Sequence, residues 1–428
     1  MSDASRITSQ RYERPYRPRA VALGNALGRA AERAGARIRL DEASLVAAAR
    51  RATGLEGSVD APWRESLRRL LDSMEREAGL HTLGRLIARQ KLVGALSNRL
   101  RADWLRDLHP EIEATPVAAP IFIAGLQRTG TTVLQRLLSL DPALRALPSW
   151  EALNPAPILD PRHPRDDGRP DGRLAQARLA EKALRYLAPD FFAIHPVEAE
   201  SPEEDVLLLD LCFQGTTPES IHRVPSFAAW LESQDAVPAY RDFRRWIQLL
   251  LWRRPGRWLG KTPHHLEFLD ALFEVFPDAK IIQTHRDPAR VTASFCSMIS
   301  HARGLSSDRV DPREVGAHWS RKQLRMVTRG MATRDRMGEG AFIDVHYADL
   351  LADPLKQVRR IYEFLELPLA DPTERAMQAW IAGHPQHRHG RHRYRLADFG
   401  LDRTVLDRDF GGYCERFGVA TESEEEDR

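Results

Sequence analysis

The sequence predicts an α/β fold, in which helices cover both faces of a parallel sheet and a helical region precedes the sheet. Two patterns indicate this fold. Short apolar runs rich in β-formers, typical of buried strands, alternate with stretches whose apolar residues recur every three or four positions, as on one face of a helix. Such alternation is typical of parallel sheets, which bind ligands at the carboxyl ends of their strands. Before residue 116 only the helical pattern occurs.

The chain divides into four expected regions: a disordered start (1–19), a helical region (20–115), the α/β domain (116–415) and a solvated acidic tail (416–428). In the helical region, Trp63, Leu67, Leu70 and Leu71 follow helical spacing. We expect this region to pack on the α/β domain or cover its site.

The expected elements of the α/β domain follow in chain order. Four apolar runs are expected to be strands: 116–124, 257–260, 279–285 and 341–346. Helices are expected over 206–213, 227–252 with a break at Pro238, 264–276, 288–301, and from Asp353-Pro354 onward, where a capping side chain precedes a first-turn proline. Residues 152–202, rich in Pro, Asp and Arg, are expected to be irregular.

Composition excludes several classes of protein. The 428 residues are 43% hydrophobic, which is enough for a packed core and excludes a wholly disordered chain. The 63 basic residues nearly balance the 60 acidic ones, so we expect no broad nucleic-acid-binding surface. The start of the chain lacks the apolar core of a signal peptide, and the most apolar stretch, 206–213, is too short to cross a bilayer. The three cysteines form no CxxC pair. We therefore expect a cytoplasmic protein without a transmembrane segment.

The strongest motif follows the first expected strand and opens a helix: Gly125-Leu126-Gln127-Arg128-Thr129-Gly130-Thr131-Thr132. Glycines let the backbone approach an anion closely, and a helix N-terminus offers free N–H groups and the positive end of its dipole. A nucleotide triphosphatase requires Lys after the second glycine. Here Thr131 stands at that position and the cation is Arg128, whose guanidinium can bind phosphate or sulfate with two hydrogen bonds. A lone GxxxxG is more often a plain turn. With the strand, cation, threonines and helix together, we expect anion binding.

A second cluster, His285-Arg286-Asp287-Pro288, follows the third expected strand, and Ser294 comes eight residues after Arg286. Alone, this cluster could be a helix cap beside a surface arginine. Its position at a strand end makes Arg286 a candidate for binding an anion.

Together the two clusters resemble the sulfotransferases that use 3′-phosphoadenosine 5′-phosphosulfate (PAPS), most closely their large, mostly bacterial branch. In that family [KR]-[ST]-G-[ST]-T binds the 5′-phosphosulfate, which matches residues 128–132, and a strand-end Arg with a Ser eight residues on holds the 3′-phosphate, which matches Arg286 and Ser294. The resemblance runs from about residue 120 to 413. It implies a P-loop-like fold and in-line transfer of a sulfuryl group from PAPS to a hydroxyl of a small molecule, glycan or lipid, with release of PAP.

The resemblance also implies site residues. Lys261, in Gly260-Lys261-Thr262-Pro263-His264, corresponds to a Lys that stabilises the leaving phosphate. Two general bases are candidates: Glu151, at the place of a catalytic Glu, and His264, which lies one residue later than the family's catalytic His. We prefer Glu151 for that reason. A late Arg-Gly loop closes on the 3′-phosphate, which makes Arg391 and Arg393 candidates.

No metal is expected, because a sulfuryl group carries less charge than a phosphoryl group and the motif lacks a convincing Mg²⁺ ligand. A P-loop kinase or NTPase is the first alternative, disfavoured by the missing Lys at position 131. The second is a non-catalytic scaffold that keeps a nucleotide pocket. The sequence leaves the acceptor and the oligomeric state open.

Overall fold

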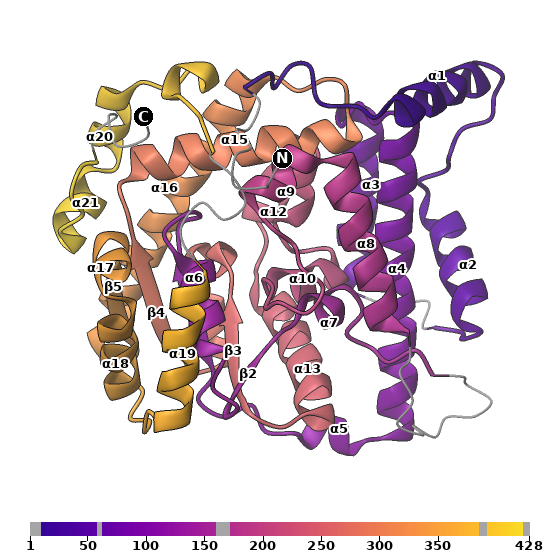
Figure 1. The fold of residues 1–428 in the computed structure, drawn as a ribbon. Helices are drawn as coiled ribbons and strands as arrows, with labels where there is room; N and C mark the ends of the chain where they lie inside the picture. Colours follow the sequence, from indigo (N-terminus) through magenta and orange to yellow (C-terminus); the bar gives the residue numbers. More distant parts are fainter. Residues whose placement is uncertain (1–9, 58–61, 160–171, 385–391, 423–428) are drawn as a thin grey trace.

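The computed structural model describes residues 10–57, 62–159, 172–384 and 392–422. Within them, five strands form one parallel sheet of order β2-β3-β1-β4-β5. The strands are β1 (Ile121–Gly125), β2 (Leu144–Ala146), β3 (Arg257–Lys261), β4 (Lys280–His285) and β5 (Phe342–His346). Because β1 is central, the loop that follows it leaves the middle of the sheet, between the ends of β3 and β4 (Figure 1).

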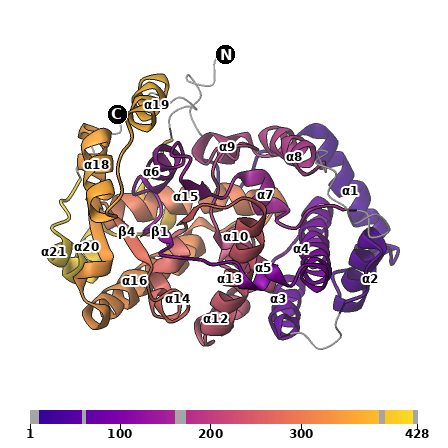
Figure 2. The same ribbon diagram turned by 90° about the horizontal axis from the view of Figure 1, so that it is seen from below.

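Both faces of the sheet are covered by helices, as the sequence predicts. Phe122 and Ala124 face a core that includes α13 (Val237–Arg253), α14 (Leu269–Val275) and α16 (Pro312–Met337). The alternate residues Ile121 and Ile123 face α6 (Thr131–Leu138), α18 (Pro354–Phe364) and α19 (Asp371–Gly383) (Figure 2). All five residues of β1 are buried. This two-sided burial explains why β1 reads as a continuous apolar run instead of an alternating one.

The first four described helices form the helical region: α1 (Arg19–Arg33), α2 (Glu42–Thr53), α3 (Trp63–Glu77) and α4 (Thr82–Leu108). They lie on the opposite side of the molecule from α18 and α19 (Figures 1 and 2). The stripe of Leu67, Leu70 and Leu71 is buried in a core shared with Phe227 of α12 (Pro225–Glu232). The helical region therefore packs directly on the α/β part of the chain.

The remaining described elements complete the fold. They are α5 (Glu111–Ala114), α7 (Ser149–Leu153), α8 (Arg173–Leu187), α9 (Pro189–Ile194), α10 (Val206–Leu209), η2 (Asp210–Cys212), α11 (Thr217–Ile221), η3 (Pro263–Glu267), α15 (Pro288–Ser306), η4 (Glu339–Ala341), α17 (Tyr347–Ala352), η5 (Leu396–Phe399), α20 (Arg403–Asp409) and α21 (Gly411–Phe417).

Two expectations about the elements were wrong in detail, and one strand was not predicted. The first strand begins at Ile121, after Pro120, because proline has no N–H to donate to a sheet. Residues 173–194 are helical where an irregular segment was expected, since Ala, Leu and Arg, which favour helices, fill this stretch behind the Pro- and Asp-rich part. The short strand β2 has no apolar run to reveal it.

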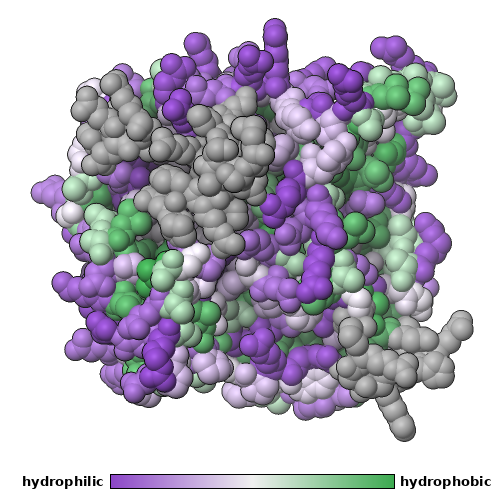
Figure 3. All heavy atoms as spheres, viewed as in Figure 1, coloured by the Kyte–Doolittle hydropathy of each residue, from purple (hydrophilic) through white to green (hydrophobic). Residues whose placement is uncertain are grey.

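None of the described helices is long and apolar enough to cross a membrane. The face seen in Figure 3 is largely hydrophilic, and its hydrophobic residues form separate patches. Leu179 and Tyr186 of α8 are among the exposed large apolar side chains.

Candidate active site

The loop from Gly125 to Gly130 connects β1 to α6. Three of its residues, Gly125, Arg128 and Gly130, have an unusual backbone position or conformation. A β-carbon at Gly125 would lie 2.6 Å from the carbonyl oxygen of Thr284, so only glycine allows β1 and β4 to approach this closely. Gly130 has φ +89°, and Arg128 has φ 67°. A left-handed conformation is uncommon for arginine and costs free energy, so the surrounding structure must hold Arg128 in place.

The threonines of the loop divide into two roles. Thr129 is fully buried, and its hydroxyl donates to the carbonyl oxygen of Leu126 at 2.6 Å and contacts the hydroxyl of Thr284 at 2.5 Å. It therefore closes the loop. Thr131 and Thr132 instead line a cleft of about 230 Å³, together with Arg128. Both residues are in the first turn of α6, whose N-terminus is a favourable place for an anion.

The structure brings the two predicted clusters together. Nε of Arg128 donates to the hydroxyl of Ser294 at 3.2 Å, and Nη1 of Arg286 donates to the carbonyl oxygen of Arg128 at 3.2 Å. Burial, together with the nearby charge of Arg286, lowers the pKa of the Arg128 guanidinium. An anion placed between the two arginines would relieve this repulsion, so the arrangement favours a multiply charged ligand.

Arg286 is held by a carboxylate from a distant part of the chain. Both oxygens of Glu422 accept hydrogen bonds from Arg286, each at 2.8 Å, and the guanidinium lies 4.1 Å from the centre of the Tyr347 ring. The backbone N–H of Glu422 donates to Asp287 at 2.8 Å. Burial alone would lower the pKa of Arg286, but its hydrogen bonds to Glu422 raise it. A carboxylate thus occupies the position predicted for a phosphate.

His392, next to the predicted basic-loop residues Arg391 and Arg393, lies beside Ser294. His392 contacts the hydroxyl of Ser297 at 2.8 Å and that of Ser294 at 3.4 Å. Burial and the charge of Arg128 lower the pKa of His392 well below its usual value, so its imidazole is neutral. Arg393 is exposed. Arg391 lies outside the described residues.

Lys261, at the end of β3, is buried and forms an ion pair with Glu204 at 2.9 Å. Thr262 donates to the other oxygen of Glu204 at 3.3 Å. Burial would raise the pKa of the neighbouring Glu203, but His195 and the charge of Lys261 overcome this effect and lower the pKa to about 2. The cleft therefore contains the ionised carboxylate of Glu203, and Glu204 on the same wall pairs with the buried Lys261.

The two candidate bases occupy different surroundings. His264 lines the cleft, and burial and the neighbouring His265 lower its pKa well below the usual value, so it is neutral. Glu151 does not belong to the described residues that line the cleft. Its carboxylate accepts a hydrogen bond from the buried guanidinium of Arg145. The preference for Glu151 in the sequence was based on family position, and nothing in the sequence indicated its pairing with Arg145.

Three cleft residues were missed as site residues by sequence reasoning: His195, Glu203 and Glu204. Glu203 and Glu204 lie just before α10 and directly after Pro202, which pairs with Pro148. What identifies them as site residues is that they lie next to Lys261. The sequence does not reveal this, because Lys261 is far from them along the chain. Asp344, in β5, accepts a hydrogen bond from Arg334 and contacts His285. No group of three His, Cys, Asp or Glu among the described residues is arranged to hold a metal ion.

The loop 125–130, called the anion loop below, follows the central strand of a parallel sheet and has Arg286 beside it. This arrangement defines a group-transfer enzyme of the P-loop type. Residues 120–371 match the model of the sulfotransferase family, and the chain belongs to that family. It is an enzyme that transfers sulfuryl groups, as the sequence motifs indicated, and the kinase and scaffold alternatives are disfavoured.

Similar proteins agree with this assignment. The solved structure of sulfotransferase STF1 from Mycobacterium tuberculosis H37Rv has 35% sequence identity and a TM-score of 0.75, covering 87% of this chain and 98% of that one. Sulfotransferase STF9 from Mycobacterium avium has 30% identity and a TM-score of 0.81, covering 90% and 99%. The omega-hydroxy-beta-dihydromenaquinone-9 sulfotransferase Stf3 of Mycobacterium bovis is 25% identical over 317 residues, which is 70% of this chain and 75% of that protein.

Proposed function

We propose that this sulfotransferase takes its sulfuryl group from PAPS, transfers it to a hydroxyl group and releases PAP. One observation carries the proposal. Arg128 and Arg286 are 158 residues apart in the chain, yet a hydrogen bond links them, and Ser294 binds the Arg128 side chain. Two cationic groups this close suit a nucleotide with anionic groups at both the 5′ and 3′ positions of its ribose.

In this proposal the loop residues Gly125, Arg128, Thr129, Gly130, Thr131 and Thr132 form the 5′-phosphosulfate site. Thr129 contributes by fixing the loop, because its hydroxyl is already bonded within the protein. Arg286 and Ser294 hold the 3′-phosphate, which requires Arg286 to leave Glu422. Arg393 and Arg391 are proposed to close over the same phosphate.

The donor supplies an activated sulfuryl group, and the protein aligns it with the acceptor and stabilises the charge of the leaving phosphate. Lys261 is the proposed source of that stabilisation. Its ammonium is buried, so its charge acts at short range in a medium that screens it little. The pair with Glu204 holds the ammonium at the end of β3.

The acceptor hydroxyl must lose a proton, and a base must lie within reach of it. Between the two candidates, the geometry favours His264, since its side chain lines the cleft in which the acceptor hydroxyl is proposed to lie. Glu151 is engaged with Arg145. We therefore propose His264 as the base.

The acceptor is proposed to be a lipid-like alcohol, in preference to a glycan or a small polar molecule. The name of the mycobacterial relative specifies a hydroxylated menaquinone, which is a lipid hydroxyl. That relative is 25% identical to this chain, so its acceptor class supports the proposal without specifying the molecule.

The donor assignment is tested by calorimetric titration with PAP and, separately, with Mg·ATP. We expect PAP to bind and Mg·ATP to bind much more weakly. Incubation with PAPS and a cell extract, followed by mass spectrometry, should yield a product heavier by one SO₃ group. Tight Mg·ATP binding without PAP binding would overturn the donor assignment.

A further inference from the structure

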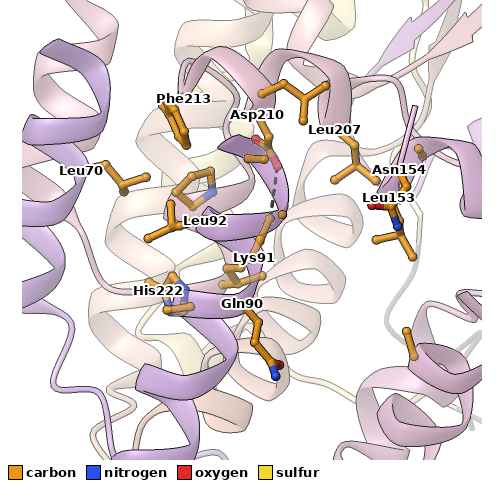
Figure 4. A pocket seen from close by; sticks show the side chains of 18 of the residues that line it. Leu70, Gln90, Lys91, Leu92, Leu153, Asn154, Leu207, Asp210, Phe213 and His222 are labelled. Carbon is orange, nitrogen blue, oxygen red and sulfur yellow. Dashed lines mark hydrogen bonds and ion pairs between the residues drawn. The ribbon is translucent and has the colours of Figure 1, made fainter. Parts of the chain in front are cut away.

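A second hollow of about 560 Å³ adjoins the cleft, whose volume is about 230 Å³. Figure 4 shows side chains that line this second hollow. Its walls come from α3 and α4 of the helical region and from α7, α8, α10 and α11. Leu207 of α10 and Ile221 of α11 line both spaces. The cavity and the cleft thus meet at these two residues.

The cavity is mainly apolar. Leu70, Met74, Leu92, Leu153 and Phe213 are among the side chains that line it (Figure 4). A volume of this size falls within the range of about 300–1,000 Å³ typical of ligand pockets.

The polar groups on its wall do not give the cavity a net charge. Lys91 and Asp210 form an ion pair at 3.2 Å, so their charges cancel (Figure 4). Burial and the charges of Lys91 and Arg303 lower the pKa of His222 to about 3, so this imidazole is neutral at physiological pH. An anionic or cationic ligand would lose its hydration here without gaining a partner charge. An uncharged, apolar ligand would gain free energy by burial.

We infer that this cavity holds the apolar part of an uncharged acceptor alcohol, whose hydroxyl extends past Leu207 and Ile221 into the cleft beside the anion loop. The inference rests on the proposed function, because it assigns the cavity to the acceptor of sulfuryl transfer. It gives the helical region a role in acceptor specificity, since α3 and α4 supply much of the cavity wall.

Gly94, within α4, makes the inference testable. It lines the cavity, and a β-carbon built on it would meet no heavy atom within 4 Å. In the variant Gly94→Leu the β-carbon therefore enters open space and the longer side chain takes up part of the cavity. Leucine also favours a helix more than glycine does. Gly24 of α1 provides a matched control: it is also a helical glycine with nothing within 4 Å of its β-carbon, but it does not line the cavity.

The experiment measures the affinity of 1-hexanol, 1-octanol and 1-decanol by calorimetry, and their conversion to alkyl sulfates with PAPS by mass spectrometry. In the wild type, affinity should rise by about fourfold for each added methylene group. Gly94→Leu should weaken 1-decanol binding by about tenfold or more, because the new side chain takes the space of several methylenes. Gly24→Leu should leave it unchanged, and all three proteins should bind PAP equally.

The outcomes separate this inference from the proposed function. Alkyl sulfates formed with no dependence on chain length, and equally by Gly94→Leu, would overturn the cavity assignment and leave sulfuryl transfer from PAPS intact. Binding of 1-decanol that Gly94→Leu removes, with no sulfated product from any alcohol, would support an apolar binding site and contradict its role in acceptor binding. Absence of PAP binding would contradict the donor assignment alone.

Discussion

The guanidinium of Arg286 is bound by both carboxylate oxygens of Glu422, each at 2.8 Å. This contact joins the end of β4 to a residue 136 positions later in the chain. Because a carboxylate and a phosphate bind a guanidinium in the same two-pronged way, Glu422 and the proposed 3′-phosphate compete for one site.

Removal of the Glu422 charge should therefore tighten PAP binding. For Glu422→Gln we expect an affinity gain of about fivefold, since a partly exposed ion pair contributes about 1 kcal/mol. Calorimetric titration measures it. Glu415→Gln, which changes an exposed carboxylate on α21, is the control and should have no effect. Unchanged or weaker PAP binding by Glu422→Gln would show that Glu422 does not compete with the nucleotide.

Arg286→Ala should weaken PAP binding by about ten- to a hundredfold, because a hydrogen bond to a charged group contributes about 1.5–3 kcal/mol. The side chain also donates to the carbonyl oxygen of Arg128, so thermal unfolding must be measured alongside. Arg286→Lys keeps the charge but loses the paired geometry, and its affinity should be intermediate. If the Arg286→Ala protein is folded and binds PAP as tightly as the wild type, Arg286 does not bind the 3′-phosphate.

Substitution of the two candidate bases should have different effects, one on catalysis and the other on stability. His264→Gln should lower kcat by about 10²–10⁴ while PAP still binds, as expected for loss of a general base. Glu151→Gln should instead lower the free energy of unfolding by about 3 kcal/mol, because it leaves the buried Arg145 guanidinium without its counter-charge. Single-turnover kinetics and urea unfolding of both variants distinguish the effects. A large loss of kcat in a stable Glu151→Gln protein would make Glu151 the base.

Stability should fall as the solution is acidified, and His222 should contribute measurably. Its pKa is lowered by burial to about 3, while in the unfolded chain it is near 6.5. Between these values the unfolded state binds one more proton than the folded state, so the contribution of His222 to stability is complete above about pH 6.5 and declines below it. The decline is about 1.4 kcal/mol per pH unit. Urea unfolding from pH 7 to 5 should show a shallower pH dependence for His222→Gln than for the wild type, and equal slopes would contradict the assignment.

The sequence predicts the parts of this molecule that depend on neighbouring residues. Gly125, Gly130 and the apolar run before them predict the anion loop, and the eight-residue interval from Arg286 to Ser294 predicts the second cluster. In the structure Arg286 and Ser294 each form a hydrogen bond with Arg128 of that loop. Local spacing suffices here because strand ends of a parallel sheet converge on one edge.

What the sequence leaves open depends on contacts between distant segments. No pattern links Glu422 to Arg286, and the pairing of Glu151 with Arg145 depends on β2, which is only three residues long. The cavity was also beyond prediction. Periodicity marked Leu67 and Leu70 as core residues, but the hollow arises where side chains are small, as at Gly94 and Ala95.

Two serines of α15 form hydrogen bonds with residues from distant parts of the chain. Tyr12 donates to Ser297 at 3.0 Å, and Arg128 donates to Ser294. His392 contacts both serines. During synthesis on the ribosome, the chain can form its sheet once β5 has emerged, but this junction stays incomplete until residue 392 is outside the exit tunnel. Nascent enzyme should consequently gain protease resistance from added PAP only at a late stage of translation.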